Sequence, residues 1–317
     1  MNNTTFYKVL DLLLVAIVYP AAFLLKYIRR IGVKKFPTCK RALLQVGVFP
    51  IRNHYYEPLF DGRQLRHALS DKRRLPGIDW NVDTQLAILK SFTSAQELCS
   101  FTNQHFDGKT FFFGNGAFES GDAEYLYNII RLKKPRCIIE VGSGYSTLMA
   151  MHAVAKNKEE DPGYACEHIC IEPYERPWLE SLNVTVLRNK VEDVDRQVFS
   201  KLGADDLLFI DSSHMIRPQG DVLFEILELF HILNKGVIVH LHDIFSPADY
   251  PEVWVLEEVH FWNEQYLLEA FLSCNTQWAI IGALNFLHHE HHEALKETCP
   301  FLDKDREPGS FYMQKIA

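Results

Sequence analysis

The sequence predicts an α/β protein: a Rossmann-like, doubly wound sheet of seven strands, mainly parallel, with helices on both faces and a helical N-terminal extension. From residue 136 onward, short apolar runs of strand length alternate with amphipathic segments of helical spacing. This alternation is typical of parallel sheets, because a helix must cross back between successive parallel strands. The last two strand-like runs lack a full crossover helix between them, so we expect an antiparallel last strand.

The predicted elements follow one another along the chain. Apolar segments predict strands at residues 136–142, 168–173, 184–189, 205–214, 236–243, 277–284 and 310–316. Apolar residues at helical spacing predict helices at residues 84–104, 122–134, 146–156, 221–233 and 254–273. The second of these helices follows a glycine-rich loop and must end before Pro135, because proline cannot continue a helix.

Three regions are expected along the 317 residues: an apolar N-terminal helix at 1–35, a connecting arm with helices at 36–110, and the α/β domain at 111–317. The net charge of −8 offers no overall basic surface, so we predict no nucleic-acid partner. The seven cysteines are odd in number and contain no CxxC pair, which indicates free thiols in a reducing compartment.

The apolar run at residues 12–25 is followed by basic residues, which indicates contact with a membrane. A spanning helix needs about 20 apolar residues. This run is shorter, and Asp11 and Pro20 weaken it. Three interpretations stay open: a short anchor or in-plane helix at residues 6–30, a true span, and a helix that packs on its own domain or on a partner. Because the basic residues follow the run, we predict a cytoplasmic protein that can bind the inner face of a membrane.

The first predicted strand ends in the motif EVGSGYST, which is typical of a nucleoside cofactor site. Gly142 and Gly144 permit a tight turn and a close approach of ligand to backbone. Thr147 stands where a phosphate-binding dinucleotide loop has a third glycine, and Glu140 before the turn suits a cationic ligand better than a pyrophosphate. Glu172 ends the second strand, where an acid can accept hydrogen bonds from both ribose hydroxyls. This combination favours S-adenosylmethionine over NAD.

Four blocks in order carry a resemblance to a known family: EVGSGYST, IEP, FIDSSHMIRPQGD, and HLHDIF with SPADYP. They resemble the class I S-adenosylmethionine-dependent methyltransferases, and more narrowly the methyltransferase-24-like group, from about residue 113 to the C-terminus. The resemblance implies methyl transfer to an oxygen or nitrogen of a small-molecule or glycan-like acceptor. It implies that these residues line the cofactor: Glu140, Gly142, Ser143, Gly144, Glu172, Asp211 and Ser212, with Glu192 or Asp193 near the adenine.

Charged side chains follow the fourth and fifth predicted strands, where a doubly wound sheet binds its ligands. Asp211 and His214 follow the fourth strand, and His242 and Asp243 end the fifth, so we expect them to converge beside the cofactor. Related sugar O-methyltransferases hold a divalent metal with two adjacent acids after the fifth strand. The resemblance therefore implies a metal site of Asp211, His242 and Asp243, with or without His214. A histidine ligand suits manganese, iron or zinc better than magnesium.

A metal-free mechanism is the alternative for the same residues. His214 or His242 would act as general base on the acceptor, with Asp211 near the transferred methyl group, because a histidine has its pKa near neutrality. His240 lies deeper in the strand and is predicted to be a hydrogen-bonded core residue.

Two interpretations from other classes also stay open: a metal-dependent oxygenase on the same fold, and a non-catalytic membrane-associated scaffold. The histidine-rich segment at 287–295 is predicted to begin a surface helix. Trp254 and Trp262 are predicted either to cover the acceptor pocket or to pack in the core. The expected partners are a small-molecule or glycan acceptor, a membrane surface and, as an open alternative, a second copy of the chain.

Overall fold

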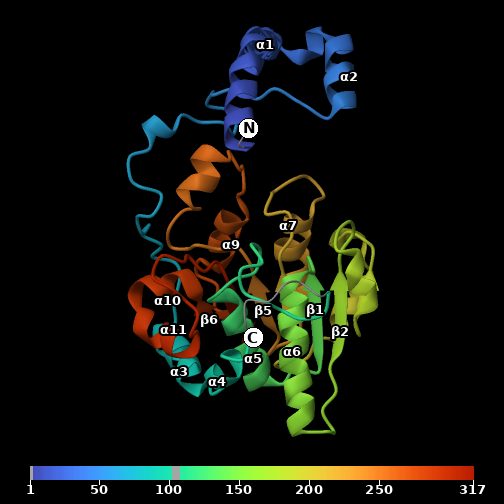
Figure 1. The fold of residues 1–317 in the computed structure, drawn as a ribbon, viewed down its shortest axis with the longest axis vertical. Helices are drawn as coiled ribbons and strands as arrows, with labels where there is room; N and C mark the ends of the chain where they lie inside the picture. The colour runs from blue at the N-terminus through green and yellow to red at the C-terminus, as the bar shows by residue number, and fades with distance from the viewer. Residues whose placement is uncertain (1–2, 102–107) are drawn as a thin grey trace. The chain divides into compact units, whose positions relative to one another are not determined.

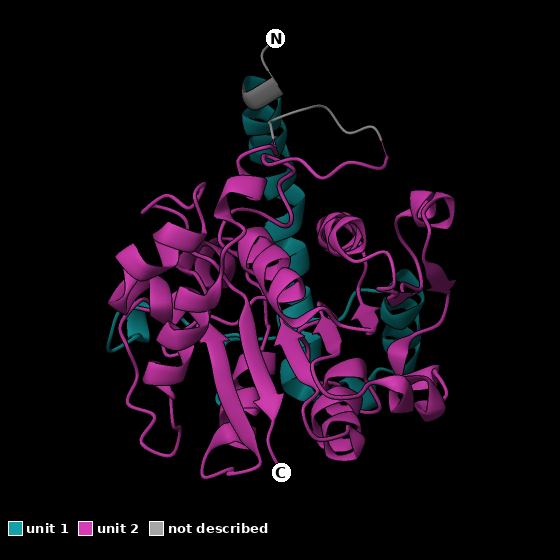
Figure 2. Ribbon diagram, turned by 90° about the horizontal axis from the view of Figure 1, so that it is seen from below, with its two compact units in different colours: residues 1–68 teal, residues 69–317 magenta. Residues whose placement is uncertain are grey.

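The computed structural model describes residues 3–101 and 108–317 of the chain. The chain divides into two compact units, Met1–Ala68 and Leu69–Ala317, which are coloured separately in Figure 2. The boundary falls inside the connecting arm expected at residues 36–110. All strands of the sheet lie in the second unit.

The first unit begins with one long helix, α1 (Asn3–Ile31), at the blue end of the chain in Figure 1. Its segment Thr5–Ile31 contains an 18-residue window with a mean hydropathy of 2.1, and it is long and apolar enough, by length and composition, to cross a membrane. Residues on both sides of the apolar run continue the helix and Pro20 does not end it, so the three interpretations of this segment stay open.

Three shorter pieces complete the regular structure of the described part of the first unit. A 3₁₀ turn (Val33–Lys35) leads into α2 (Pro37–Val46), which starts with proline at its first position and ends at Gly47 in the left-handed conformation. A second 3₁₀ turn spans Gly62–Gln64.

The second unit contains a seven-stranded sheet with the order β3-β2-β1-β4-β5-β7-β6. The strands are β1 (Cys137–Val141), β2 (Glu167–Ile171), β3 (Thr185–Leu187), β4 (Leu207–Ile210), β5 (Ile238–Leu241), β6 (Trp278–Ala283) and β7 (Phe311–Lys315). Only β7 runs antiparallel: it lies between β5 and β6, and the other neighbouring pairs are parallel. This topology confirms the predicted fold class. The chain crosses from one half of the sheet to the other between β1 and β4, and ligands bind at such a switch point.

Helices cover both faces of the sheet, and successive strand residues face opposite layers. Ile138 packs in the layer of α5 (Asp122–Lys133) and α6 (Tyr145–Glu160), together with α3 (Val82–Ser91), α10 (Leu284–Glu290) and α11 (His292–Thr298). Ile139 packs in the opposite layer, against α7 (Asp221–Phe224), a π turn (Glu225–Leu229), α8 (Phe230–Ile232) and α9 (Glu264–Leu272).

Two predicted helices are interrupted in the structure. The helix expected at 84–104 is split into α3 and α4 (Ala95–Leu98), because the chain is extended at Phe92; residues 102–104 lie outside the described part. The helix expected at 254–273 is split into a π turn (Val253–Glu257) and α9. The second break has a tertiary cause, since the carbonyl of His214 accepts the N–H groups of Asn263 and Glu264 at 2.9 and 3.2 Å, which anchors the start of α9.

Candidate functional site

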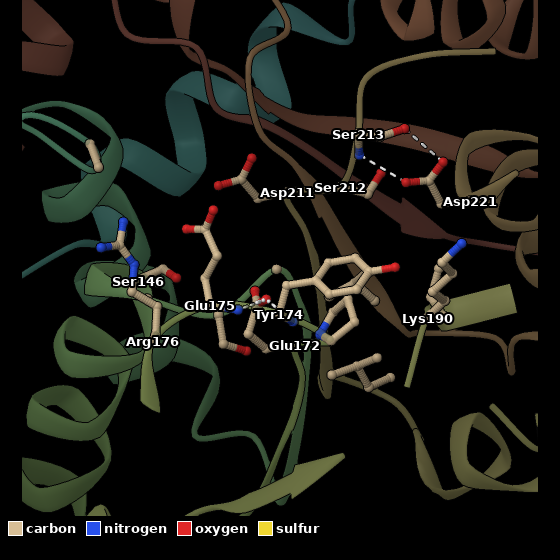
Figure 3. Close-up of a pocket in the computed structure, with 18 of the residues that line it drawn as sticks. Ser146, Glu172, Tyr174, Glu175, Arg176, Lys190, Asp211, Ser212, Ser213 and Asp221 are labelled. Atoms are coloured by element: carbon tan, nitrogen blue, oxygen red, sulfur yellow. Dashed lines mark hydrogen bonds between the residues drawn. The ribbon is translucent and has the colours of Figure 1, made fainter. Parts of the chain in front are cut away.

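A cavity of about 390 Å³ lies at the carboxyl ends of β1 to β4, within the size range of small-molecule sites (Figure 3). Its wall includes residues 141–146, 171–176, 190–192 and 211–213. Arg176 and Lys190 lie on opposite sides of it (Figure 3). Of the residues predicted to hold the cofactor, the following line this cavity: Gly142, Ser143, Gly144, Glu172, Asp211, Ser212 and Glu192.

The turn after β1 requires glycine at Gly142. Its φ is +77°, and a Cβ there would stand 1.8 Å from the carbonyl oxygen of Asp211. The strand ends are also tied together, because Asp211 donates its N–H to Val141 at 2.8 Å. Thr147 caps the turn by accepting the N–H of Gly144 at 3.1 Å, so the position without the third glycine has a structural role of its own.

Glu172 is held on the cavity wall by the loop that comes after it. Its Oε1 accepts the N–H groups of Tyr174 at 3.1 Å and Glu175 at 2.9 Å. Both bonds engage the same oxygen and orient the carboxylate.

Glu140 is not brought to the cavity. It is fully buried on the α5–α6 side of the sheet, with Oε2 at 2.8 Å from Nε2 of His168 and 3.6 Å from Sγ of Cys170. Its Oε1 has no hydrogen-bond partner among the described residues. The physical reason is strand alternation: Glu140 shares a face with Ile138, below the turn and against the helices.

The end of β4 and the loop after β5 bring one imidazole between three carboxylates. Nε2 of His214 lies 3.2 Å from Oδ1 of Asp211 and 3.6 Å from Oδ2 of Asp243. Nδ1 of His214 lies 2.9 Å from Oε2 of Glu264, and its ring centroid is 4.4 Å from that of Trp262. The ligand atoms of Asp211, His214 and Asp243 lie within 4.8 Å of one another, so the three could hold a metal ion.

His242 is placed differently from the prediction. Its Nε2 lies 3.6 Å from Oδ1 of Asp243, but its ring packs against Phe118 at 5.2 Å. The cluster of mutually close ligand atoms contains His214 in place of His242. β5 ends at Leu241, and Asp243 after it takes a left-handed φ of 57°, so the two residues do not continue the alternation of the strand.

His240 is a core residue, as the sequence predicts. Its Nε2 is 2.9 Å from Oγ of Ser310, and its ring lies between those of Phe209 and Tyr312. Burial lowers its pKa well below the usual value, and the charge of His242 lowers it further.

Electrostatics favour a positive charge at the centre of the cluster. Burial lowers the pKa of His214, but its hydrogen bonds to Asp211 and Glu264 and their charges outweigh burial, so this pKa lies well above the usual value. Burial raises the pKa of Asp211, but the hydrogen bond from His214 and the charges of His242 and His214 leave it lowered overall. Either a proton on His214 or a bound cation would balance the carboxylates around it.

Several site residues were not identified from the sequence. Glu264 orients His214, but a glutamate in an amphipathic helix carries the pattern of a solvent-facing residue. Asp221 accepts both the N–H of Ser213, at 2.9 Å, and its hydroxyl, at 2.7 Å, and so fixes the loop after β4. Ser212 donates to buried Glu225 at 3.0 Å. Asp221 stands in the quoted block FIDSSHMIRPQGD, which was the available signal.

The remaining candidates lie outside the cavity wall. His288 is buried, with Nε2 at 3.1 Å from the carbonyl of Lys304, so the surface-helix interpretation of residues 287–295 holds only in part. Trp254 and Trp262 are partly exposed, with ring centroids 5.1 Å apart. Trp262 therefore connects the His214 cluster to a partly open aromatic surface.

Comparison with known proteins gives a family match and distant relatives. Residues 139–244 match the model of a methyltransferase domain. An uncharacterized protein of Archaeoglobus fulgidus is 29% identical over 172 residues, which cover 50% of this chain and 76% of that protein.

Solved structures with a similar chain trace include the O-methyltransferase TomG of Streptomyces achromogenes, which is involved in tomaymycin synthesis and was solved with SAM. The similarity covers 75% of this chain and 97% of TomG, with 13% identity and a TM-score of 0.40. A putative O-methyltransferase of Klebsiella pneumoniae is similar over 75% of this chain and 91% of its own, with 12% identity and a TM-score of 0.40. The matched residues run from β1 to the loop after β5 and include most of the cavity wall.

Proposed function

Residues 139–244 belong to a class I S-adenosylmethionine-dependent methyltransferase domain, and from this premise we propose that the enzyme methylates an oxygen or nitrogen of a small-molecule or glycan-like acceptor. Asp211 carries the proposal because it belongs to two sites at once. It lines the cavity, and its Oδ1 lies 3.2 Å from Nε2 of His214. An acceptor group beside Asp211 would meet both the cofactor cavity and a proton-holding pair.

The cavity residues fit S-adenosylmethionine. When bound, this cofactor supplies an electrophilic methyl group on a sulfonium ion. We assign its ribose hydroxyls to Glu172, whose carboxylate is already oriented by two backbone N–H groups. The methionine portion would lie at the turn of residues 142–144. An added Cβ at Gly144 would have only the Nε of Arg176 within 4 Å, so the backbone there is open to a ligand.

For proton handling, we assign the acceptor proton to the Asp211–His214 pair. Methyl transfer depends mainly on holding the nucleophile in line with the methyl group, and the cavity rim at Asp211 is where this alignment would be set. His214 is pre-oriented by Glu264 on its other ring nitrogen. It can act as a base only in its neutral form, after its own proton has passed to solvent.

A divalent metal is the alternative way to activate the acceptor. Asp211, His214 and Asp243 would hold it, and Glu264 would orient the imidazole from behind, as second-layer carboxylates do in metal sites. A metal there would lower the pKa of an acceptor hydroxyl. One imidazole with two carboxylates suits manganese, iron or zinc better than magnesium. Iron would also keep open an oxygenase reaction on this fold.

The first test is calorimetric titration of the purified protein with S-adenosylmethionine and S-adenosylhomocysteine. Glu172→Ala should weaken binding at least about tenfold, because each charge-assisted hydrogen bond is worth about 1.5–3 kcal/mol. Glu172→Gln keeps an oxygen for the N–H groups of Tyr174 and Glu175 and should weaken binding less. Glu167→Ala, at the far end of β2, is the matched control. Folded protein that binds neither ligand would refute the proposed function.

The metal alternative has its own measurement, a manganese titration with metal analysis of the purified protein. His214→Asn and Asp243→Asn should each lower manganese affinity, by the roughly 10- to 100-fold or more seen for altered metal surroundings. His242→Asn is the matched control and should bind as the parent does. Loss of binding in His242→Asn alone would instead favour the site predicted from the sequence. No binding to the parent protein would leave the metal-free mechanism.

We further propose that α1 anchors the enzyme to the inner face of a membrane. Support comes from its length, from an 18-residue window with a mean hydropathy of 2.1, and from the basic residues near its C-terminal end, which favour a cytoplasmic location for the second unit. The full chain should stay with membranes after an alkaline carbonate wash. Leu14→Glu with Ile17→Glu should release it. Release of the unaltered protein would contradict the anchor.

A further inference from the structure

We propose that residues 37–57 form a second membrane contact, an in-plane helix and an aromatic loop that bind the surface of an anionic lipid bilayer next to α1. This inference rests on the membrane anchoring by α1 proposed above. It adds a separate contact and a preference for one class of lipid.

Helix α2 is amphipathic, and on its apolar face Leu43 is only partly covered within the described chain. Apolar side chains recur at the spacing of one helix face: Cys39, Ala42, Leu43 and Val46. None of the residues of α2 is buried within the described chain, and Val46 is 77% exposed. Lys40 and Arg41 lie off this face, together with the exposed Leu44. A helix with one apolar and one basic face suits the boundary between lipid headgroups and acyl chains.

The loop after α2 presents two exposed tyrosines and is tied to the end of α1. Tyr55 and Tyr56 are 92% and 85% exposed. Glu57 accepts hydrogen bonds from Nε of Arg29 at 3.0 Å and from Nε of Arg52 at 2.8 Å. The guanidinium of Arg29 also lies over the ring of Phe49, at 5.3 Å from its centroid.

This tie places the loop at the level where lipid headgroups begin. Arg29 follows the last residue of the apolar run, Leu25, by four positions, or about 6 Å along a helix axis. Tyrosine is enriched at that level of a membrane, because its ring is apolar and its hydroxyl is polar. We therefore expect the exposed rings of Tyr55 and Tyr56 to lie among the lipid headgroups.

Charge identifies the lipid as anionic. The sequence has no acidic residue between Asp11 and Glu57, and Glu57 is paired with two arginines. The same stretch carries these basic residues: Lys26, Arg29, Arg30, Lys34, Lys35, Lys40, Arg41 and Arg52. Each basic residue near an anionic bilayer favours binding about fivefold.

Chain length also favours the bilayer over a distant protein partner. Pro37 follows Ile31, the last residue of α1, by six positions, which span at most about 20 Å when extended. If α1 is in the membrane, α2 cannot leave the vicinity of its surface.

The test uses full-length protein reconstituted in phosphatidylcholine vesicles with and without phosphatidylglycerol. Cys99 and Cys274 are replaced by serine, and a polarity-sensitive dye is attached to Cys39 on the apolar face of α2. The emission of this dye should shift to the blue in phosphatidylglycerol vesicles, and the shift should weaken in salt. Lys40→Ala with Arg41→Ala should lower the ratio of docked to undocked helix about 25-fold.

Matched labels control for position. In a Cys39→Ser background, a dye at Gln45→Cys on the polar side of α2 should stay in water, and the background without an added cysteine measures labelling elsewhere. A dye at Leu14→Cys reports on α1. Binding of S-adenosylhomocysteine by each labelled protein checks that the second unit is folded.

Each contrary outcome has a distinct meaning. A dye at residue 39 in water, with the dye at residue 14 in lipid, overturns this inference and leaves the anchor by α1. Both dyes in water overturn the two together. Equal burial in lipid of the dyes at residues 39 and 45 would contradict an in-plane helix, because its two sides should differ. A blue shift that fades as the protein is diluted in lipid reports contact between copies of the chain, which also overturns the proposal.

Discussion

The position of one imidazole shows what a single backbone conformation decides. The sequence predicted a metal site of Asp211, His242 and Asp243, with or without His214. In the structure the mutually close ligand atoms are those of Asp211, His214 and Asp243, and His214 takes a left-handed φ of 57° with its ring beside both aspartates. Non-glycine residues rarely adopt this conformation, so a sequence pattern does not reveal it. The positions of Asp211 and Asp243 at the strand ends could be predicted, because the end of each apolar run marks where its strand ends.

We expect His214 in the metal-free protein to stay protonated well above the usual pKa of 6.5. Because Glu264 accepts a hydrogen bond from this imidazole and its charge favours the protonated form, Glu264→Gln should lower the pKa of His214. Stabilisation by this proton is present below the unfolded pKa and is lost as pH rises through the higher folded pKa. NMR titration of labelled histidines, with His214→Asn for assignment and Tyr266→Phe on the same helix as control, measures it. An unchanged pKa in Glu264→Gln would contradict the assignment.

The two glycines of the first turn should respond differently to alanine. Gly142→Ala places a Cβ at 1.8 Å from the carbonyl of Asp211 in a left-handed conformation, so it should destabilise the fold by about 2 kcal/mol or more. Gly144→Ala has only Nε of Arg176 nearby, at 3.7 Å, and should leave stability unchanged while weakening binding of S-adenosylhomocysteine. Urea unfolding and calorimetry separate the two effects. Equal stability of both variants would count against this reading of the turn.

At the scale of elements, buried strands were the most predictable part. Each is a short apolar run between turn signals, and the structure keeps all seven within a few residues of the predicted ends, apart from the polar residues after β4. The break before α9 was not predictable, because its cause is tertiary. The carbonyl of His214, about 50 residues earlier in the chain, accepts the N–H groups of Asn263 and Glu264 at the start of the helix. Local apolar spacing continues across residues 254–273, whereas the helix does not.

The start of α5 should make stability depend on pH. Burial raises the pKa of Glu124 to about 7, although its bonds from the N–H groups of Phe301 and Gly121 oppose this. The folded state therefore holds an extra proton between the unfolded pKa of 4.5 and about 7, and stability should fall as pH rises through this window. The loss is at most about 3 kcal/mol. Urea unfolding at several pH values should show a flatter profile for Glu124→Gln than for exposed Glu293→Gln, and equal profiles would refute the assignment.

At the scale of the molecule, the boundary after Ala68 separates an apolar, basic unit from the catalytic one. Contacts within the second unit begin at once: Leu69 accepts the N–H of Asp249 at 2.9 Å, and Arg73 donates its N–H to Pro247 at 3.1 Å and its guanidinium to Glu269. The sequence predicted a connecting arm here but not its division, because the division depends on these long-range contacts.

A chain that lacks residues 1–68 should therefore fold and bind S-adenosylhomocysteine as the full chain does. Both core layers and every residue of the cavity wall lie after this boundary. The shortened chain should no longer bind membranes. Circular dichroism, calorimetry and vesicle flotation check the three points. An unfolded product would show that the first unit contributes to the stability of the second.

The place of β7 has a consequence for how the protein is made. Residues 311–315 emerge last from the ribosome among the strands, yet β7 lies between β5 and β6. Until it arrives, β5 has an open edge and β6 has no strand partner in the sheet. Such unpaired edges invite pairing with other chains. Prematurely terminated translation products should thus be substrates for chaperones and proteases, even though they contain the whole cavity wall.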